Sequence, residues 1–206
     1  MHVMDLENED HVVLFNKFSV IPNHLLVISR EFQSQSDPIL ESNFNAVLET
    51  MRSIALPEGT GMKWLAFYNA GKQAGASQPH RHMQLIPTEE IPLEPVLPDI
   101  GEGLIDVYSD IEHTFMRPSK LSLGHFEAYS RGISQLRNPQ AYNLLFTEEW
   151  MLIISRQQES SHGKSMNSLA FAGSILMKTE AELHEWLGLV DGPLTGIKQL
   201  AVRRQL

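Results

Sequence analysis

Two histidines and a glutamine alternate along one short stretch of the sequence. Residues 80–86 read His-Arg-His-Met-Gln-Leu-Ile, a pattern that predicts a β-strand. Side chains alternate between the two faces of a strand, so His80, His82 and Gln84 would project from the same face. A neutral imidazole whose tautomer is held by a neighbour can attack phosphorus and form a phosphoramidate. The row is therefore a candidate for nucleophilic catalysis at phosphorus.

Two other interpretations of this row stay open on spacing alone. Histidines of a sheet are often satisfied, partly exposed residues with no chemical role. Neighbouring imidazoles on one face also suit zinc. The third group here is an amide, however, and the motif contains neither a cysteine nor an acidic partner, which argues against a metal site.

The segment just before the row consists of small residues. Asn69 ends a predicted strand, and residues 70–78 read Ala-Gly-Lys-Gln-Ala-Gly-Ala-Ser-Gln. The backbone N–H groups of such a loop can approach phosphate oxygens closely. A loop of this composition is by itself typical of an ordinary turn, but its place beside the histidine row favours a phosphate site.

Six ordered motifs resemble those of a known family. They read Asn-Lys-Phe at 16–18, His-Leu-Leu at 24–26, Phe-Tyr-Asn at 67–69, Gly-Ala-Ser-Gln-Pro-His-Arg-His-Met-Gln at 75–84, Tyr-Asn-Leu-Leu at 142–145 and Asn-Ser-Leu-Ala-Phe-Ala-Gly at 167–173. Together they resemble the ATP adenylyltransferase (diadenosine tetraphosphate phosphorylase) branch of the histidine triad superfamily. The resemblance covers most of the chain.

This resemblance implies a two-step exchange of an AMP group. His82 would attack the α-phosphorus of diadenosine tetraphosphate, release ATP and hold AMP covalently, and phosphate would then take the AMP to give ADP. His80 would orient the nucleophile or its loop, and Gln84 would hydrogen-bond a phosphate oxygen. Gln84 has no titratable proton with which to activate water, whereas phosphate is already ionised and needs no such base. The glutamine therefore favours a transferase over a hydrolase.

The resemblance also implies a nucleotide-binding set: Asn16, Lys17, Asn69, Gly75, Ala76, Ser77, Gln78, Asn167, Ser168, Leu169 and Lys178. The partners would be the dinucleotide, ATP, ADP and phosphate. We expect no metal site and no cofactor of the protein's own, and leave open a divalent cation such as Mg²⁺ carried by the nucleotide.

The elements that must position these residues are short strands and a few helices. The predicted strands are 11–18, 24–30, 64–69, 80–86, 113–116, 143–146 and 150–156; the predicted helices follow Asp37 and Pro38 as far as Met51, and cover 126–136, 180–187 and 193–201. This order predicts an α+β, HIT-like fold with a mainly antiparallel sheet packed with helices. The proline-rich segment 87–98 predicts an extended connector, dividing a HIT-like core at 1–98 from a C-terminal part at 99–206 that completes the nucleotide site.

Composition limits the remaining function classes. The chain has 206 residues, no cysteine and a net charge of −9 with histidine neutral. The negative charge argues against a broad nucleic-acid surface, and no apolar run approaches the roughly 20 residues of a membrane span. From these features we expect a cytoplasmic protein that binds neither nucleic acid nor membrane. We also expect a monomer, although no feature of the composition determines the oligomeric state.

The sequence also departs from the family it resembles. Members usually carry several dozen residues ahead of the Asn-Lys motif, which here begins at Asn16, so we expect an unpaired edge strand and exposed apolar surface near the start. Two alternatives follow: a catalytically impaired nucleotide-binding remnant, or an enzyme similar to hexose-phosphate uridylyltransferases. The second normally has metal-binding cysteines, which this chain lacks.

Overall fold

The computed structural model describes residues 2–6, 10–19, 21–137 and 139–205. Its strands are β1 (His2–Asp5), β2 (His11–Phe15), β3 (Leu25–Ser29), β4 (Lys63–Ala70), β5 (His82–Thr88), β6 (Glu102–Gly103), β7 (His113–Met116), β8 (Tyr142–Phe146), β9 (Met151–Ser155), β10 (Ser160–Ser161) and β11 (Lys164–Ser165). Its α-helices are α1 (Glu41–Ser53), α2 (Pro118–Leu121), α3 (His125–Gln135), α4 (Glu180–Leu187) and α5 (Pro193–Lys198), and its 3-10 helices are η1 (Lys72–Ala74), η2 (Glu94–Val96), η3 (Asp106–Tyr108) and η4 (Ser168–Ala172).

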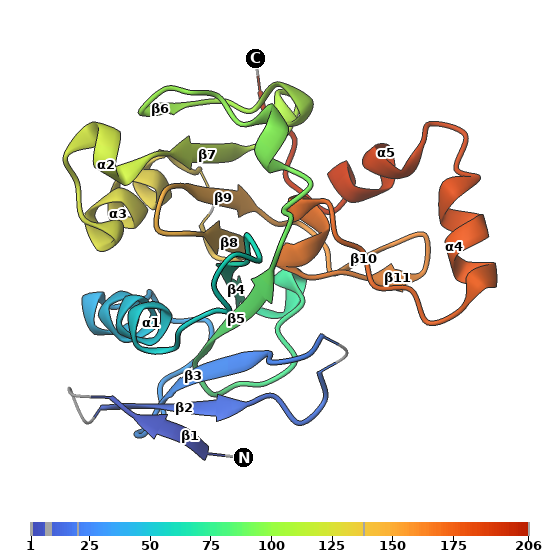
Figure 1. Ribbon diagram of the computed structural model, residues 1–206. Helices are drawn as coiled ribbons and strands as arrows, with labels where there is room; N and C mark the ends of the chain where they lie inside the picture. The colour runs from blue at the N-terminus through green and yellow to red at the C-terminus, as the bar shows by residue number, and fades with distance from the viewer. Residues whose placement is uncertain (1, 7–9, 20, 138, 206) are drawn as a thin grey trace.

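One antiparallel sheet runs through both halves of the chain. Its strand order is β1-β2-β3-β5-β4-β8-β9-β7-β6, which Figure 1 shows from bottom to top. The two halves meet where β4 pairs with β8, in a register that sets Asn69 opposite Asn143. This mainly antiparallel α+β architecture confirms the predicted fold class. The division of the chain at residue 98 stays a prediction, since the sheet continues across it.

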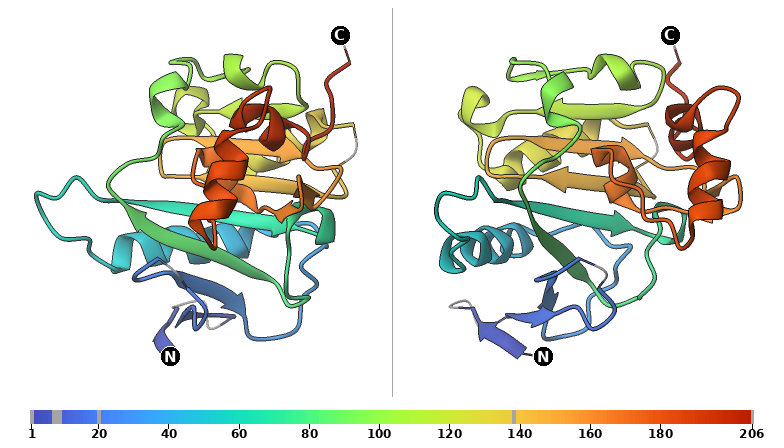
Figure 2. Two further views of the ribbon diagram at one scale, coloured as in Figure 1. Left: turned by 90° about the vertical axis from the view of Figure 1, so that its right-hand side faces the viewer. Right: turned by 45° about the vertical axis from the view of Figure 1, so that its right-hand side comes forward.

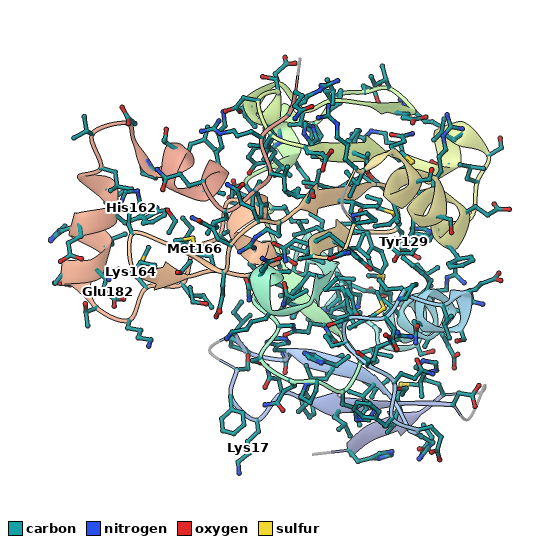
Figure 3. The ribbon with its side chains drawn as sticks, turned by 180° about the vertical axis from the view of Figure 1, so that it is seen from behind. Lys17, Tyr129, His162, Lys164, Met166 and Glu182 are labelled. Carbon is teal, nitrogen blue, oxygen red and sulfur yellow. The ribbon has the colours of Figure 1, made fainter. Side chains whose placement is uncertain are left out.

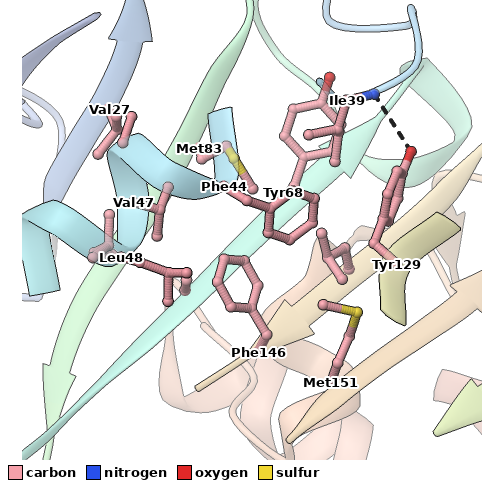
Figure 4. Close-up of a cluster of buried hydrophobic side chains, with 14 of the residues drawn as sticks. Val27, Ile39, Phe44, Val47, Leu48, Tyr68, Met83, Tyr129, Phe146 and Met151 are labelled. Carbon is pink, nitrogen blue, oxygen red and sulfur yellow. Dashed lines mark hydrogen bonds between the residues drawn. The ribbon is translucent and has the colours of Figure 1, made fainter. Parts of the chain in front are cut away.

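Each face of the sheet carries its own apolar core. Helices α1 and α3 lie on one side of the sheet and α4 and α5 on the other (Figure 1). Figure 4 shows Phe44 and Val47 of α1 packed against Tyr68 and Phe146 of the sheet. On the opposite face, alternate strand residues such as Phe67 contact the cluster that includes η4. Because side chains alternate between the two faces of a strand, β4 contributes residues to both cores.

The second face is covered only in part. The C-terminal helices stand in front of one half of the sheet, and no helix stands in front of β2 and β3 (Figure 2). There, Leu26 and Ile28 of β3 share a face with Gln84 and His82 of β5, because the register pairs Leu26 with Gln84 and Ile28 with His82. His82 and Gln84 of the histidine row thus lie on the half of the sheet that helices leave uncovered.

Helix α1 begins later than the sequence predicts. Asp37 and Pro38 predict its first turn, whereas α1 starts at Glu41 with Leu40 as its N-cap. Ile39 is buried in the apolar core, and its N–H donates to the Tyr129 hydroxyl at 3.4 Å (Figure 4). These tertiary contacts hold the preceding segment extended and override the local capping signal.

Strand β5 also differs from its predicted limits. It begins at His82 and continues through Pro87 to Thr88. The two residues before it are held by a neighbouring segment instead, where the Arg81 N–H donates to the Gln33 carbonyl at 2.7 Å. Pro87 is tolerated in the strand because β3 pairs with β5 only as far as Leu85, so the missing N–H falls beyond that pairing. The connector is shorter than predicted and includes η2.

The start of the chain does not leave β2 unpaired. Strand β1 pairs with it in antiparallel register, so β1 is the edge strand of the described sheet. The side chains of Phe15, Phe18 and Phe32 are exposed, and the first two of them line a cavity.

Two other elements end earlier than the sequence predicts: β2 ends at Phe15, and α5 ends at Lys198. Among the described residues, no helix is both long and apolar enough to cross a membrane.

Candidate active site

The histidine row faces a cavity of about 420 Å³ on the uncovered half of the sheet. Leu14, Leu26 and Ile28 form an apolar wall, and His80, His82 and Gln84 all line the cavity. A second cavity of about 270 Å³ adjoins it and is bounded by residues 165–176 of the C-terminal part. Gly75, Ser77 and Asn167 line both cavities. Both halves of the chain therefore contribute to one extended site.

The imidazole of His82 is held as a defined tautomer. Its Nδ1 lies 2.8 Å from the His80 carbonyl oxygen, and a carbonyl can only accept, so Nδ1 carries the proton and Nε2 keeps its lone pair. No described residue is hydrogen-bonded to Nε2. Burial lowers the pKa of His82, although the hydrogen bond to the carbonyl opposes this shift. The ring is therefore neutral at pH 7 and presents a free nucleophilic nitrogen.

His80 orients the neighbouring histidine through its backbone. Its own ring Nε2 lies 3.1 Å from the Ser29 hydroxyl and 3.3 Å from the Glu31 carbonyl oxygen. The ring also contacts Phe32, with 5.6 Å between the ring centroids. The main-chain carbonyl of His80, and not its imidazole, accepts the hydrogen bond from His82 Nδ1–H.

A chain of hydrogen bonds sets the orientation of the Gln84 amide. The Phe18 N–H donates to Asn16 Oδ1 at 3.0 Å, so Asn16 turns its NH₂ toward His24 Nδ1, at 3.3 Å. The Ser19 hydroxyl lies 3.2 Å from the same nitrogen. Because the NH₂ group of Asn16 can only donate, His24 Nδ1 accepts, and its Nε2–H donates to Gln84 Oε1 at 3.0 Å. Burial lowers the pKa of His24, which keeps that ring neutral and able to accept. Because its oxygen is occupied, Gln84 offers its NH₂ group to the cavity.

Two asparagines of the site, Asn69 and Asn167, also have their amide oxygens bonded to protein donors, as Gln84 does. Asn69 Oδ1 accepts from the Asn143 amide at 2.9 Å and from the Ser168 N–H at 3.0 Å. Asn167 Oδ1 accepts from the Leu169 N–H at 3.0 Å. Both asparagines line the cavity and have their NH₂ groups left for a ligand. With Gln84, they make a set of amide donors around His82, which suits an anionic group.

The loop before the row depends on a glycine for its position. Gly75 has φ +85°, and a Cβ there would lie 2.8 Å from the Met166 carbonyl oxygen. Only glycine allows this left-handed backbone and this close approach. The glycine therefore brings the loop of Ser77 and Gln78 against the C-terminal part of the chain.

Seven of the eleven predicted nucleotide-binding residues line the first cavity: Asn16, Lys17, Asn69, Gly75, Ser77, Gln78 and Asn167. Lys17 projects from the loop after β2 (Figure 3). Ser168 and Leu169 are buried behind the lining, where they orient the two asparagines. Ala76 lies in the loop but is not among the lining residues. Lys178 is exposed ahead of α4 and lines neither cavity, so the structure does not bring it into the site.

Three residues of the site were missed as functional candidates. His24 lies in a motif of the sequence, but no role follows from that motif. Asn143 is a polar residue within an otherwise apolar strand, and Arg156 follows a strand directly. Asn143 also lies in the Tyr-Asn-Leu-Leu motif at 142–145, and an isolated polar residue in a buried strand is the further signal that could have found it. The described residues contain no group of three or more histidine, cysteine, aspartate or glutamate side chains that could hold a metal.

Comparisons with known proteins match most of this chain. A family model described as the Ap4A phosphorylase N-terminal domain matches residues 1–99, and one described as the ATP adenylyltransferase C-terminal domain matches residues 103–203. Two curated relatives come from Saccharomyces cerevisiae. Diadenosine tetraphosphate phosphorylase 2 is 24% identical over 84% of this chain and 64% of its own length. Protein APA1 is 23% identical over 84% of this chain and 63% of its own. The chain thus spans less than two thirds of each relative.

Solved structures of a yeast protein have the same fold. Yeast Ap4A phosphorylase Apa2 in complex with AMP superimposes with a TM-score of 0.79 at 25% identity, covering 98% of this chain and 77% of that one. The same protein in complex with Ap4A has a TM-score of 0.77 at 22% identity, with the same coverage.

Proposed function

Because the chain belongs to the Ap4A phosphorylase and ATP adenylyltransferase family, we propose that it cleaves diadenosine tetraphosphate with phosphate to give ADP and ATP, reversibly, through an AMP–histidine intermediate on His82. The observation that carries the proposal is the state of this imidazole. Its Nδ1 is held by the His80 carbonyl at 2.8 Å, and its Nε2 is left free in a cavity lined by amide donors. Nucleophile and anion-binding groups thus share one site.

In the first step, Nε2 of His82 forms a bond to the α-phosphorus of the dinucleotide. The bond from that phosphorus to the bridging oxygen breaks, and its electron pair leaves with ATP. The ring becomes positively charged, and its Nδ1–H remains bonded to the carbonyl of His80, which stabilises that charge. The NH₂ groups of Gln84, Asn69 and Asn167 would donate to the phosphoryl oxygens, on which negative charge accumulates.

In the second step, an oxygen of inorganic phosphate attacks the same phosphorus. The P–N bond breaks, its electron pair returns to Nε2, and ADP is formed. Phosphate is ionised at neutral pH and needs no base, whereas water would need one. Gln84 cannot serve as that base because an amide does not titrate in this range. The site is therefore suited to phosphorolysis rather than hydrolysis.

Intact-protein mass spectrometry tests the proposal directly. The protein is incubated with diadenosine tetraphosphate in the absence of phosphate, and we expect an AMP adduct that disappears, with formation of ADP, when phosphate is added. His82→Ala should form no adduct. His184→Ala serves as the matched control, because His184 is exposed on α4 and lines neither cavity. A protein that binds the dinucleotide without forming an adduct would instead be a nucleotide-binding remnant.

The comparisons do not favour the uridylyltransferase alternative, since both family models describe adenylyl chemistry. Lys178 lies outside both cavities, and its role in nucleotide binding stays a prediction. The monomeric state and the cytoplasmic location stay predictions.

A further inference from the structure

Arg156 is a buried cation without a carboxylate partner at ion-pair distance among the described residues. Its exposed fraction is 3%. One terminal nitrogen donates to Asn143 Oδ1, and the other donates to the carbonyls of Gln158, Glu159 and Met166. Burial lowers its pKa to about 10, partly offset by the charge of Glu159, so the guanidinium is still charged at pH 7. All of its hydrogen-bond acceptors are neutral, and its remaining contact is with the Phe171 ring, 5.5 Å from the guanidinium carbon to the ring centroid. A buried charge held in this way is costly, which raises the question of what it does for the site.

The hydrogen bonds of Arg156 have a direction that leads to the cavity. A guanidinium can only donate, so Asn143 must turn its oxygen toward Arg156. Its NH₂ group then donates to Asn69 Oδ1 at 2.9 Å and to the Ala74 carbonyl at 2.9 Å. With its oxygen occupied, Asn69 keeps its NH₂ group facing the cavity. Arg156 therefore donates to Asn143, Asn143 donates to Asn69, and Asn69 is left to donate to a ligand.

The cavity itself holds little positive charge. Among the residues that line the two cavities, Lys17 is the only lysine or arginine, and it is an exposed side chain on a loop. A ligand with several phosphate charges would meet mostly neutral donors there. In the low-dielectric interior, a nearby buried cation polarises the hydrogen bonds in front of it. Arg156 is thus placed to supply charge where the lining has almost none.

We propose that Arg156 is a positioning residue for the phosphate of the bound nucleotide, acting through Asn143 on the Asn69 amide. The inference rests on the proposed function, because it assigns the phosphate end of the nucleotide to the Asn69 side of the cavity. Arg156 touches no ligand in this scheme. Ser168 also holds the Asn69 oxygen, through its N–H at 3.0 Å and its hydroxyl at 2.7 Å, so the part that Arg156 adds is to strengthen the hydrogen bond that Asn69 donates.

A purely structural role is the competing explanation. The same guanidinium ties together the carbonyls at 158, 159 and 166, and Met166 is the residue against which Gly75 packs. Loss of Arg156 could therefore loosen the whole wall of the cavity. Such loosening would weaken binding of any nucleoside, with or without a phosphate. The relay described above would affect only ligands that carry one.

The test compares AMP with adenosine, which differ only in the phosphate. Affinities of both are measured by calorimetry for the wild type, Arg156→Met, Arg156→Lys and Asn143→Asp. Arg156→Met removes the charge at similar length, Arg156→Lys keeps it, and Asn143→Asp neutralises it while presenting an oxygen to Asn69. We expect the preference for AMP over adenosine to fall about tenfold or more in the methionine and aspartate variants, and to be largely kept in the lysine variant.

Equal losses of AMP and adenosine affinity in every variant would overturn the proposal, as would a wild type that does not prefer AMP. Thermal unfolding identifies any variant that fails to fold, and the comparison then rests on the remaining ones, since Asn143→Asp changes no volume. None of these measurements requires turnover. A wild type that prefers AMP but never phosphorolyses the dinucleotide would refute the proposed function and leave the role of Arg156 standing.

Discussion

Replacing His24 should slow adenylylation of His82 without removing any group that touches the reacting phosphorus. His24 Nε2–H donates to Gln84 Oε1 at 3.0 Å, while its Nδ1 accepts from Asn16 at 3.3 Å. In His24→Phe, an aromatic ring of similar size can keep the contact with Phe67, whose centroid lies 5.7 Å from that of His24. The substitution therefore deletes the hydrogen bonds and largely keeps the packing.

The expected magnitude follows from the state of the Gln84 amide. A buried carbonyl oxygen without a donor costs about 1–3 kcal/mol. Gln84 can avoid this cost only by rotating its amide so that the oxygen faces the cavity, where it would oppose phosphate oxygens. We expect this rotation, which removes about 1–3 kcal/mol of transition-state stabilisation. Since 1.4 kcal/mol is about tenfold in rate, adenylylation should slow by about 5- to 150-fold.

The assay is the single-turnover rate constant of adduct formation with saturating diadenosine tetraphosphate. His24→Gln is the matched rescue variant, because its terminal NH₂ group can reach Gln84 Oε1 and restore a donor of the same polarity. We expect His24→Gln to recover most of the rate lost in His24→Phe. Thermal unfolding of both variants separates this effect from a general loss of stability. The argument would be refuted if both variants reacted at the wild-type rate, or if both were slowed equally.

Three further predictions concern the same site. Gln84→His should raise the ratio of AMP to ADP among the products, because an imidazole can activate water where an amide cannot; an unchanged ratio would contradict this. Burial lowers the pKa of His82 from its ordinary value of 6.5, so the neutral nucleophile persists below that pH. The rate of adduct formation should fall in acidic buffer with a midpoint below pH 6.5, and a midpoint above 6.5 would count against the assignment. Gly75→Ala should destabilise the protein by about 1–3 kcal/mol more than Gly59→Ala, since both have positive φ but only Gly75 would bring a Cβ within 2.8 Å of the Met166 carbonyl; equal shifts in melting temperature would disprove the close approach.

The local pattern of the chain was sufficient to predict the main parts of the site. Alternation along residues 80–86 placed the two histidines and the glutamine on one face, and the cavity lining confirms that they share it. The same alternation sent Met83 and Leu85 to the core on the other face. Strand and helix periodicity also predicted α3, α4 and the β8–β9 hairpin to within a residue or two. These features depend on side-chain direction and burial, which neighbouring residues determine.

The residues at which α1 and β5 begin are set by contacts with residues that are distant in sequence. The start of α1 moved because Ile39 is buried against Tyr129, and the start of β5 moved because residues 33–35 bind the backbone before it. Neither contact leaves a local signal. Sequence motifs likewise assigned Lys178 to the nucleotide, whereas the path of the chain ahead of α4 carries it outside both cavities.

The sequence by itself determined which chemical groups the site contains, and the tertiary structure decided the direction in which each one presents its donors and lone pairs. An amide is the same residue whether its oxygen or its NH₂ faces a ligand, and an imidazole can carry its proton on either nitrogen. Those choices were made by His24 for Gln84, across 60 positions, and by Asn143 for Asn69, across 74. A hydrogen-bond partner is selected by proximity in space, so only the folded chain could supply it.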